Sequence, residues 1–93
     1  MKYEHIGWCR EGSHDKVWGI IRLHDRDCVT FWGRRGAKLQ TKLIKVSVWE
    51  AEDLFRKKRN KGYDSVEEYE LHEVYPEFQQ DLEKTAFWAT LKI

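Results

Sequence analysis

The chain has 93 residues, of which 35% are charged and 14% aromatic, and five of the aromatic residues are Trp. A chain of this length forms one domain and hides only about 60–65% of the surface that its unfolded form exposes. This length excludes an enzyme of the usual size. No run approaches the roughly 20 apolar residues that span a bilayer. The net charge of +1 combines about +7 in residues 1–63 with −6 in residues 64–93, an asymmetry typical of a first part that meets a polyanion.

The acidic residues offer a second interpretation of that asymmetry, in which residues 64–93 fold back on the basic part and the two screen each other. In either case the predicted organisation is a core over residues 1–63 and an acidic helical extension over 64–93, packed on the same domain.

Cys9 and Cys28 form no disulfide framework, and the chain opens without a secretory signal pattern. We expect an intracellular protein, cytoplasmic or at the nucleoid or nucleus, with reduced thiols; a Cys9–Cys28 bridge stays open as the alternative.

The first half of the chain reads as strands. Alternating and apolar runs predict them over residues 3–9, 16–23, 28–33 and 39–46. Residues 16–23 are apolar on both faces, as expected for a central strand covered on two sides. In the next strand Val29 and Phe31 share one face. If they point to the core, Trp32 and Arg34 project together from the opposite side.

Residues 31–38 set one indole, two guanidinium groups and two glycines close together. An indole such as Trp32 can cover a base or sugar, Arg34 and Arg35 can grip phosphate oxygens, and a turn at Gly33 lets a phosphate backbone approach the main chain. A hairpin end with a half-buried ring is the structural alternative. The stretch is therefore a candidate nucleic-acid contact.

The second half reads as helices, and the first of them ends in a basic cluster. Ser47 and Glu50 have capping-box spacing, and the helix runs to about residue 60. Its expected apolar stripe is Val48, Ala51, Leu54 and Phe55. The cations of residues 56–61 exceed what compensation of the helix dipole explains, so the surplus favours an anionic partner.

A second capping box over Ser65–Glu68 predicts an acidic helix that ends before Pro76. Pro76 then begins a third helix, whose recurring residues are Phe78, Leu82, Thr85, Ala86 and Ala89. The expected fold class is α+β: a small antiparallel sheet of about four strands with a packed helix, followed by one or two C-terminal helices.

Catalytic and metal-binding patterns are missing from the sequence. The four histidines and two cysteines show neither Cys-x-x-Cys nor His-x-x-x-His spacing, and no glycine-rich phosphate loop occurs. We therefore expect a non-catalytic protein without a metal or cofactor.

Several of these features together resemble a WGR domain over about residues 3–63. They are the strand beginning Lys16-Val17-Trp18, the run from Phe31 to Gly36, the polar Gln40-Thr41-Lys42, and the helix with Ala51, Phe55, Lys57 and Lys58 before Lys61-Gly62-Tyr63. WGR domains are best known from DNA-dependent poly(ADP-ribose) polymerases, and they also occur in small bacterial proteins. One departure is Leu39, which stands before Gln40 where family members often have Gly.

The resemblance implies that the domain holds DNA at a strand break. Trp32 would stack on the terminal nucleotide, and Arg34 would contact phosphate or link the DNA-bound domain to a neighbouring region. Because no such region follows in this chain, a relay through Arg34 needs a partner protein.

The expected function is thus a stand-alone module that binds DNA at ends, nicks or single-stranded regions. The predicted contact residues are Trp32, Gly33, Arg34, Arg35, Lys38, Lys42, Lys57, Lys58 and Lys61. The alternative is a protein-interaction or regulatory module without nucleic-acid binding, whose surface would be the acidic helices and the aromatic C-terminus around Trp88 and Ile93. A partner protein would be contacted through Arg34 or that aromatic C-terminal segment.

Overall fold

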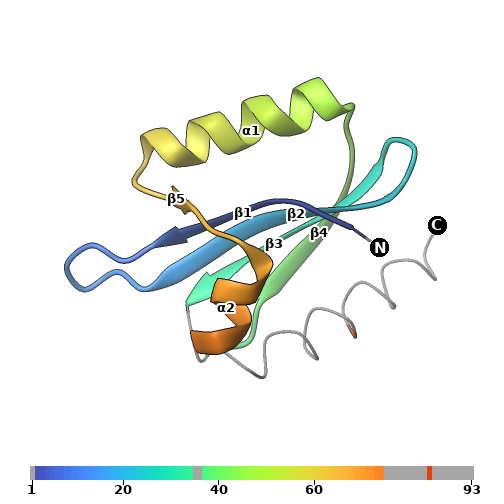
Figure 1. Ribbon diagram of the computed structural model, residues 1–93. Coiled ribbons are helices and arrows are strands. Elements are labelled where there is room, and N and C mark those ends of the chain that lie inside the picture. The colour runs from blue at the N-terminus through green and yellow to red at the C-terminus, as the bar shows by residue number, and fades with distance from the viewer. Residues whose placement is uncertain (1, 35–36, 75–83, 85–93) are drawn as a thin grey trace.

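The computed structural model describes residues 2–34, 37–74 and 84. In this part of the chain one five-stranded antiparallel sheet has the order β4-β3-β2-β1-β5, and a long helix lies across one of its faces (Figure 1). The elements are β1 (Lys2–Cys9), β2 (Lys16–His24), β3 (Asp27–Arg34), β4 (Gln40–Lys45), α1 (Val48–Asn60), β5 (Asp64–Ser65) and α2 (Glu68–Val74). The predicted α+β class is confirmed, with a fifth, two-residue strand added from the 64–93 segment.

β2 occupies the middle of the sheet and is covered on both faces. Val17 and Ile21 point to one face and Trp18 and Ile20 to the other, and each is at most 5% exposed. A strand in this position must be apolar on both sides, because neither side meets water. The prediction of a central strand over 16–23 is confirmed.

The sheet separates two apolar clusters. The helix-side core lies between the sheet and α1 and consists of Cys9, Trp18, Ile20, Cys28, Ala51, Phe55 and Tyr63. The far-side core lies on the opposite face and consists of Ile6, Trp8, Val17, Ile21, Phe31 and Leu39. α2 lies on this second side of the sheet (Figure 1).

α1 begins at the predicted capping box. The hydroxyl of Ser47 accepts a hydrogen bond from the backbone N–H of Glu50 at 3.1 Å, and the carboxylate of Glu50 accepts one from the N–H of Ser47 at 3.1 Å. Ala51 and Phe55 then point into the helix-side core. Val48 was expected in this stripe, but it is 56% exposed. The buried stripe of α1 starts one turn later, at Ala51, because Ala51 and Phe55 are the residues through which the helix contacts the sheet.

The predicted second capping box is wrong. Ser65 lies in β5, where it pairs with Gly7 of β1, so tertiary pairing takes this backbone before a helix can use it. α2 starts at Glu68 instead, and the N–H of Glu67 donates to the carboxylate of Glu70 at 2.8 Å. Pro76 and the recurring residues of the predicted third helix lie outside the described residues, as do Trp88 and Ile93; the recurring residues are Phe78, Leu82, Thr85, Ala86 and Ala89.

Both cysteines are buried with free thiols. Cys9 and Cys28 pair with Lys16 and Arg22 respectively, at opposite ends of β2, so a bridge between them is not formed. Burial raises the pKa of the Cys28 thiol, which keeps it protonated near neutral pH. None of the described helices combines the length and apolar character needed to cross a membrane.

Candidate nucleic-acid interface

Strand register places Trp32 and Arg34 of the Trp-Gly-Arg motif on the face of the sheet that carries α1, whereas Gly33 between them is on the opposite face. Trp32 of β3 lies opposite Trp18 of β2, and Arg34 lies opposite Lys16. Because side chains alternate along a strand, Lys16 and Trp18 point to the same face as Trp32 and Arg34. Trp32 and Arg34 therefore share their face with a lysine and a second indole from the neighbouring strand.

The C-terminal end of α1 reaches this same region. The N–H of Tyr63 donates to the carbonyl of Lys58 at 3.2 Å, and the N–H of Gly62 donates to the carbonyl of Arg59 at 3.0 Å. This pair of bonds is a Schellman motif, in which the residue after the helix cap needs a left-handed backbone. Gly62 supplies it with a φ of 103°. The motif folds Tyr63 back against Lys58.

Two ammonium groups flank the Tyr63 ring. The Nζ atom of Lys16 lies 5.9 Å from the centroid of that ring, and the Nζ atom of Lys58 lies 6.0 Å from it. Lys58 Nζ also lies 5.9 Å from the ring of Trp18. Strands β2 and β3, helix α1 and the turn after it thus build one surface, which we call the basic aromatic cluster. Its residues are Lys16, Trp18, Trp32, Arg34, Lys58, Lys61 and Tyr63.

Within the part of the chain that the structure describes, the cations of the basic aromatic cluster have no acidic partner. Among the described residues no carboxylate lies within 4.0 Å of the charged groups of Lys16, Arg34, Lys58 or Lys61. The pKa of Lys58 is lowered by its burial and by repulsion from Lys61 and Lys16. Uncompensated positive charge of this kind is stabilised when an anion binds.

Of the two possibilities for Trp32, the structure shows the half-buried ring rather than the freely projecting one. It is partly buried against the helix-side core, because the face opposite Val29 and Phe31 carries its own apolar layer under α1. Strand alternation alone assigns one core-facing side to β3, whereas both of its sides face an apolar core. Trp32 therefore offers only its uncovered part to a ligand, and it stays fixed beside Trp18.

Gly33 and Arg34 have distinct roles in the structure. Gly33 has a φ of 155°, and a Cβ atom there would lie 3.2 Å from Cδ2 of Leu39, so the backbone favours glycine. Arg34 is exposed, and its Nη2 donates to the carbonyl of Ser13 in the β1–β2 turn at 3.3 Å. This bond holds the guanidinium at the end of the sheet and leaves its other N–H groups available to a ligand.

The other predicted contact residues separate into two groups. Lys38 and Lys42 are exposed, and Lys42 lies opposite Thr30 on the face that carries α1, at the edge strand β4. Lys57 differs, because its Nζ lies 3.6 Å from the carboxylate of Asp53 one turn earlier. Arg35 lies outside the described residues.

Sequence reasoning missed three residues of the basic aromatic cluster: Lys16, Trp18 and Tyr63. The available signals were the pairing of strands 16–23 and 28–33, which places Lys16 beside the motif once the register is known, and the glycine at residue 62, which turns Tyr63 back toward the helix. Neither signal predicts how close the ammonium groups lie to the rings of Trp18 and Tyr63, because that depends on how α1 packs on the sheet.

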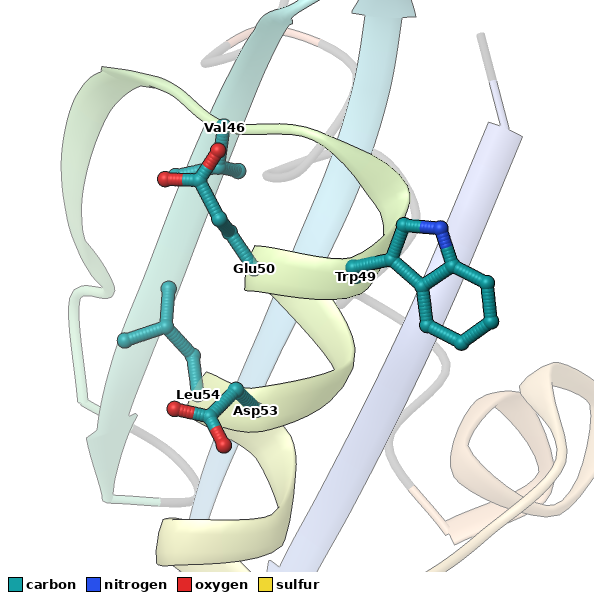
Figure 2. A pocket seen from close by; sticks show the side chains of 5 residues that line it. All are labelled: Val46, Trp49, Glu50, Asp53 and Leu54. Carbon is teal, nitrogen blue, oxygen red and sulfur yellow. The ribbon is translucent and has the colours of Figure 1, made fainter.

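A separate pocket lies at the other end of α1. It has a volume of about 450 Å³ and is lined by Val46, Trp49, Glu50, Asp53 and Leu54. Figure 2 shows the Trp49 ring directed away from the helix on the side opposite to Glu50 and Leu54. Trp49 is 79% exposed. An apolar surface with carboxylates at its rim is suited to a protein partner rather than to a polyanion.

Comparison of the chain with protein-family models, curated proteins and solved structures gave no match. The resemblance to a WGR domain therefore stays a prediction from the residues that carry it.

Proposed function

We propose that this chain is a non-catalytic module that binds DNA, at ends, nicks or single-stranded regions, through the basic aromatic cluster. The observation that carries the proposal is the convergence of Lys16, Arg34 and Lys58 on one face, from three segments of the chain, beside aromatic rings and without a carboxylate partner among the described residues. The resemblance of residues 3–63 to a WGR domain supports the preference for ends and nicks.

The binding mode follows from the chemistry of the cluster. Lysine ammonium groups and the Arg34 guanidinium neutralise phosphates, and the uncovered part of Trp32 stacks on one base or sugar, worth about 1–3 kcal/mol. Such contacts fix position and carry no base sequence. Lys42 in β4 and Lys38 just before that strand extend the cationic surface. Arg34 is also the residue through which we propose contact with a partner protein.

Fluorescence anisotropy with nicked, blunt and single-stranded DNA tests the proposal. At roughly 50 mM salt, Trp32→Ala should weaken binding on the order of tenfold, because stacking is lost. Trp32 also packs against the core, so a thermal unfolding curve must accompany that variant. Arg34→Gln, at an exposed position, removes one phosphate contact without disturbing the core. The proposal is wrong if the folded parent binds none of the three DNAs, or if Arg34→Gln binds as the parent does.

A second candidate function, a protein-interaction module, is favoured by the exposure of Trp49 beside the pocket at the start of α1. Its partner would be a peptide segment with an apolar side chain that packs on Val46, Trp49 and Leu54, because Glu50 and Asp53 already pair with Arg26 and Lys57. A purified partner that binds the parent and Arg34→Gln alike, and loses binding with Trp49→Ala, would support this function over DNA binding.

A further inference from the structure

Among the lysines whose side chains the structure describes, Lys58 is distinguished by its surroundings. Its side chain is half-buried, and its Nζ lies 5.9 Å from the ring of Trp18 and 6.0 Å from the ring of Tyr63. The Schellman motif fixes its backbone, because the carbonyl of Lys58 accepts hydrogen bonds from the N–H groups of Lys61 at 3.0 Å and Tyr63 at 3.2 Å. The amine is therefore positioned rather than freely mobile.

The groups that face the Lys58 amine disfavour its charge. Lys16 comes from β2, Lys61 follows α1, and both are cations; burial, followed by Lys61 and Lys16, lowers the pKa of Lys58. Tyr63 adds no charge, because burial raises the pKa of its phenol. The rings themselves favour an ammonium group, but distances near 6 Å lie at the limit of a cation–π contact. At a given pH, the fraction of Lys58 in the neutral, nucleophilic amine form is consequently larger than that of a fully solvated lysine.

The same surroundings attract a small anionic reagent. Lys61 and Lys16 present positive charge to the amine, and Arg34 lies opposite Lys16; none of the three has a carboxylate partner among the described residues. A negatively charged acyl donor is thereby concentrated next to the nucleophile. Lys57, one residue earlier, has different surroundings: it is exposed, and its Nζ lies 3.6 Å from the carboxylate of Asp53.

We propose that Lys58 is a site of covalent acylation in this protein, taking its acyl group from a small acyl phosphate. The lone pair of the neutral Lys58 amine attacks the carbonyl carbon of the donor and forms a C–N bond. The bond from that carbon to the phosphate oxygen breaks, and inorganic phosphate leaves with the electron pair. The nitrogen releases its proton to water, so the products are a neutral amide, phosphate and a proton, with no change of oxidation state.

Acylation would remove one cation from the basic aromatic cluster. Where the proposed DNA binding holds, the acylated protein should bind DNA more weakly, because one phosphate contact is lost. This consequence rests on the proposed function, whereas the modification itself does not.

Incubation of the purified full chain with acetyl phosphate at pH 7.5, without nucleic acid, tests the modification. Digestion after acidic residues and mass spectrometry give the initial acetylation rate at each lysine, with Lys57 as the internal control. We expect Lys58 to react on the order of threefold faster than Lys57, or more. A rate at Lys58 equal to or below that of Lys57 would overturn the proposal.

A variant tests the physical cause. Lys16→Gln, at a partly exposed position, removes one of the cations that face Lys58, which should raise the pKa of the amine and weaken attraction of the donor. The ratio of the Lys58 rate to the Lys57 rate should therefore fall. An unchanged ratio would contradict the role assigned to the cluster. Anisotropy of the acetylated protein with DNA is then a separate measurement, and a failure there would count against the proposed function alone.

Discussion

Trp18 of β2 and Phe55 of α1 stack with their ring planes 10° apart and their centroids 6.0 Å apart. Phe55 also stacks on His5 of β1, with centroids 4.8 Å apart. This one side chain therefore joins α1 to the two strands that it covers, and it determines where the basic end of the helix lies.

Replacement of Phe55 should be the most damaging change in the helix. Phe55→Ala leaves a cavity between α1 and the sheet and should lower the free energy of unfolding by about 3–5 kcal/mol. Urea unfolding followed by tryptophan fluorescence measures the loss. Val48→Ala, in the same helix at a 56% exposed position, is the matched control and should stay within about 0.5 kcal/mol of the parent. Equal losses in the two variants would contradict the assigned packing.

The paired guanidinium of Arg22 should not tolerate replacement by lysine. Its Nε and Nη2 donate to the two carboxylate oxygens of Glu4 at 2.7 and 2.8 Å, and its Nη1 donates to the carbonyl of Val46 at 3.0 Å. An ammonium group cannot make this fork, so Arg22→Lys should cost about 1–3 kcal/mol in unfolding free energy.

Arg26→Lys is the control for that measurement. Arg26 makes a single exposed contact with Glu50, at 3.0 Å, and contacts of this type contribute little. Chemical unfolding of the two variants side by side should therefore separate them. A loss in Arg26→Lys as large as in Arg22→Lys would show that the paired geometry does not matter.

The stability of the fold should fall as the pH drops through the range of histidine. Burial lowers the pKa of His5 below its ordinary value of 6.5, so the unfolded chain binds a proton that the native protein resists. The contribution of His5 to stability is present above pH 6.5 and is lost as the pH falls below it. Unfolding midpoints in urea between pH 5 and 8 measure this trend. In His5→Phe the loss of stability at low pH should be smaller than in the parent. Identical pH profiles for the two proteins would contradict the role assigned to His5.

The salt dependence of DNA binding should report on Lys58. With about four phosphates neutralised, the affinity of the parent should fall on the order of 10²-fold between roughly 50 and 200 mM salt. Lys58→Gln should reduce the slope of log affinity against log salt by about 1. Lys45→Gln, whose ammonium group pairs with Asp27 at 3.3 Å at the opposite end of β3, is the control and should keep the parental slope.

The local pattern of the sequence predicts much of this fold, because the responsible interactions are local. The capping box at Ser47 and Glu50 needs only neighbouring residues, and the alternation that places Trp32 and Arg34 on one face needs only the period of a strand. The central position of residues 16–23 follows from their apolar character on both faces. Each of these predictions is confirmed.

The errors arise where distant segments compete for the same groups. Ser65 has the spacing of a helix cap, yet β1 takes its backbone into the sheet. Trp32 alternates away from Phe31 as predicted, but α1 forms a second core on that side. Lys16 enters the candidate site only through its register with Arg34, which no local pattern encodes. The partner of each of these residues lies far away along the chain.

The number of residues between Phe55 in α1 and Gly62 just after it determines where the basic side chains of the candidate site lie. Phe55 fixes the rotation of the helix on the sheet, and Gly62 ends it seven residues later with Lys58 above Trp18. Successive residues of an α-helix are rotated by about 100° around the helix axis. One residue inserted between Phe55 and Lys58 would keep every charge of the protein and yet swing the Lys58 amine away from Trp18, so the spacing in this segment is as much a part of the site as its side chains.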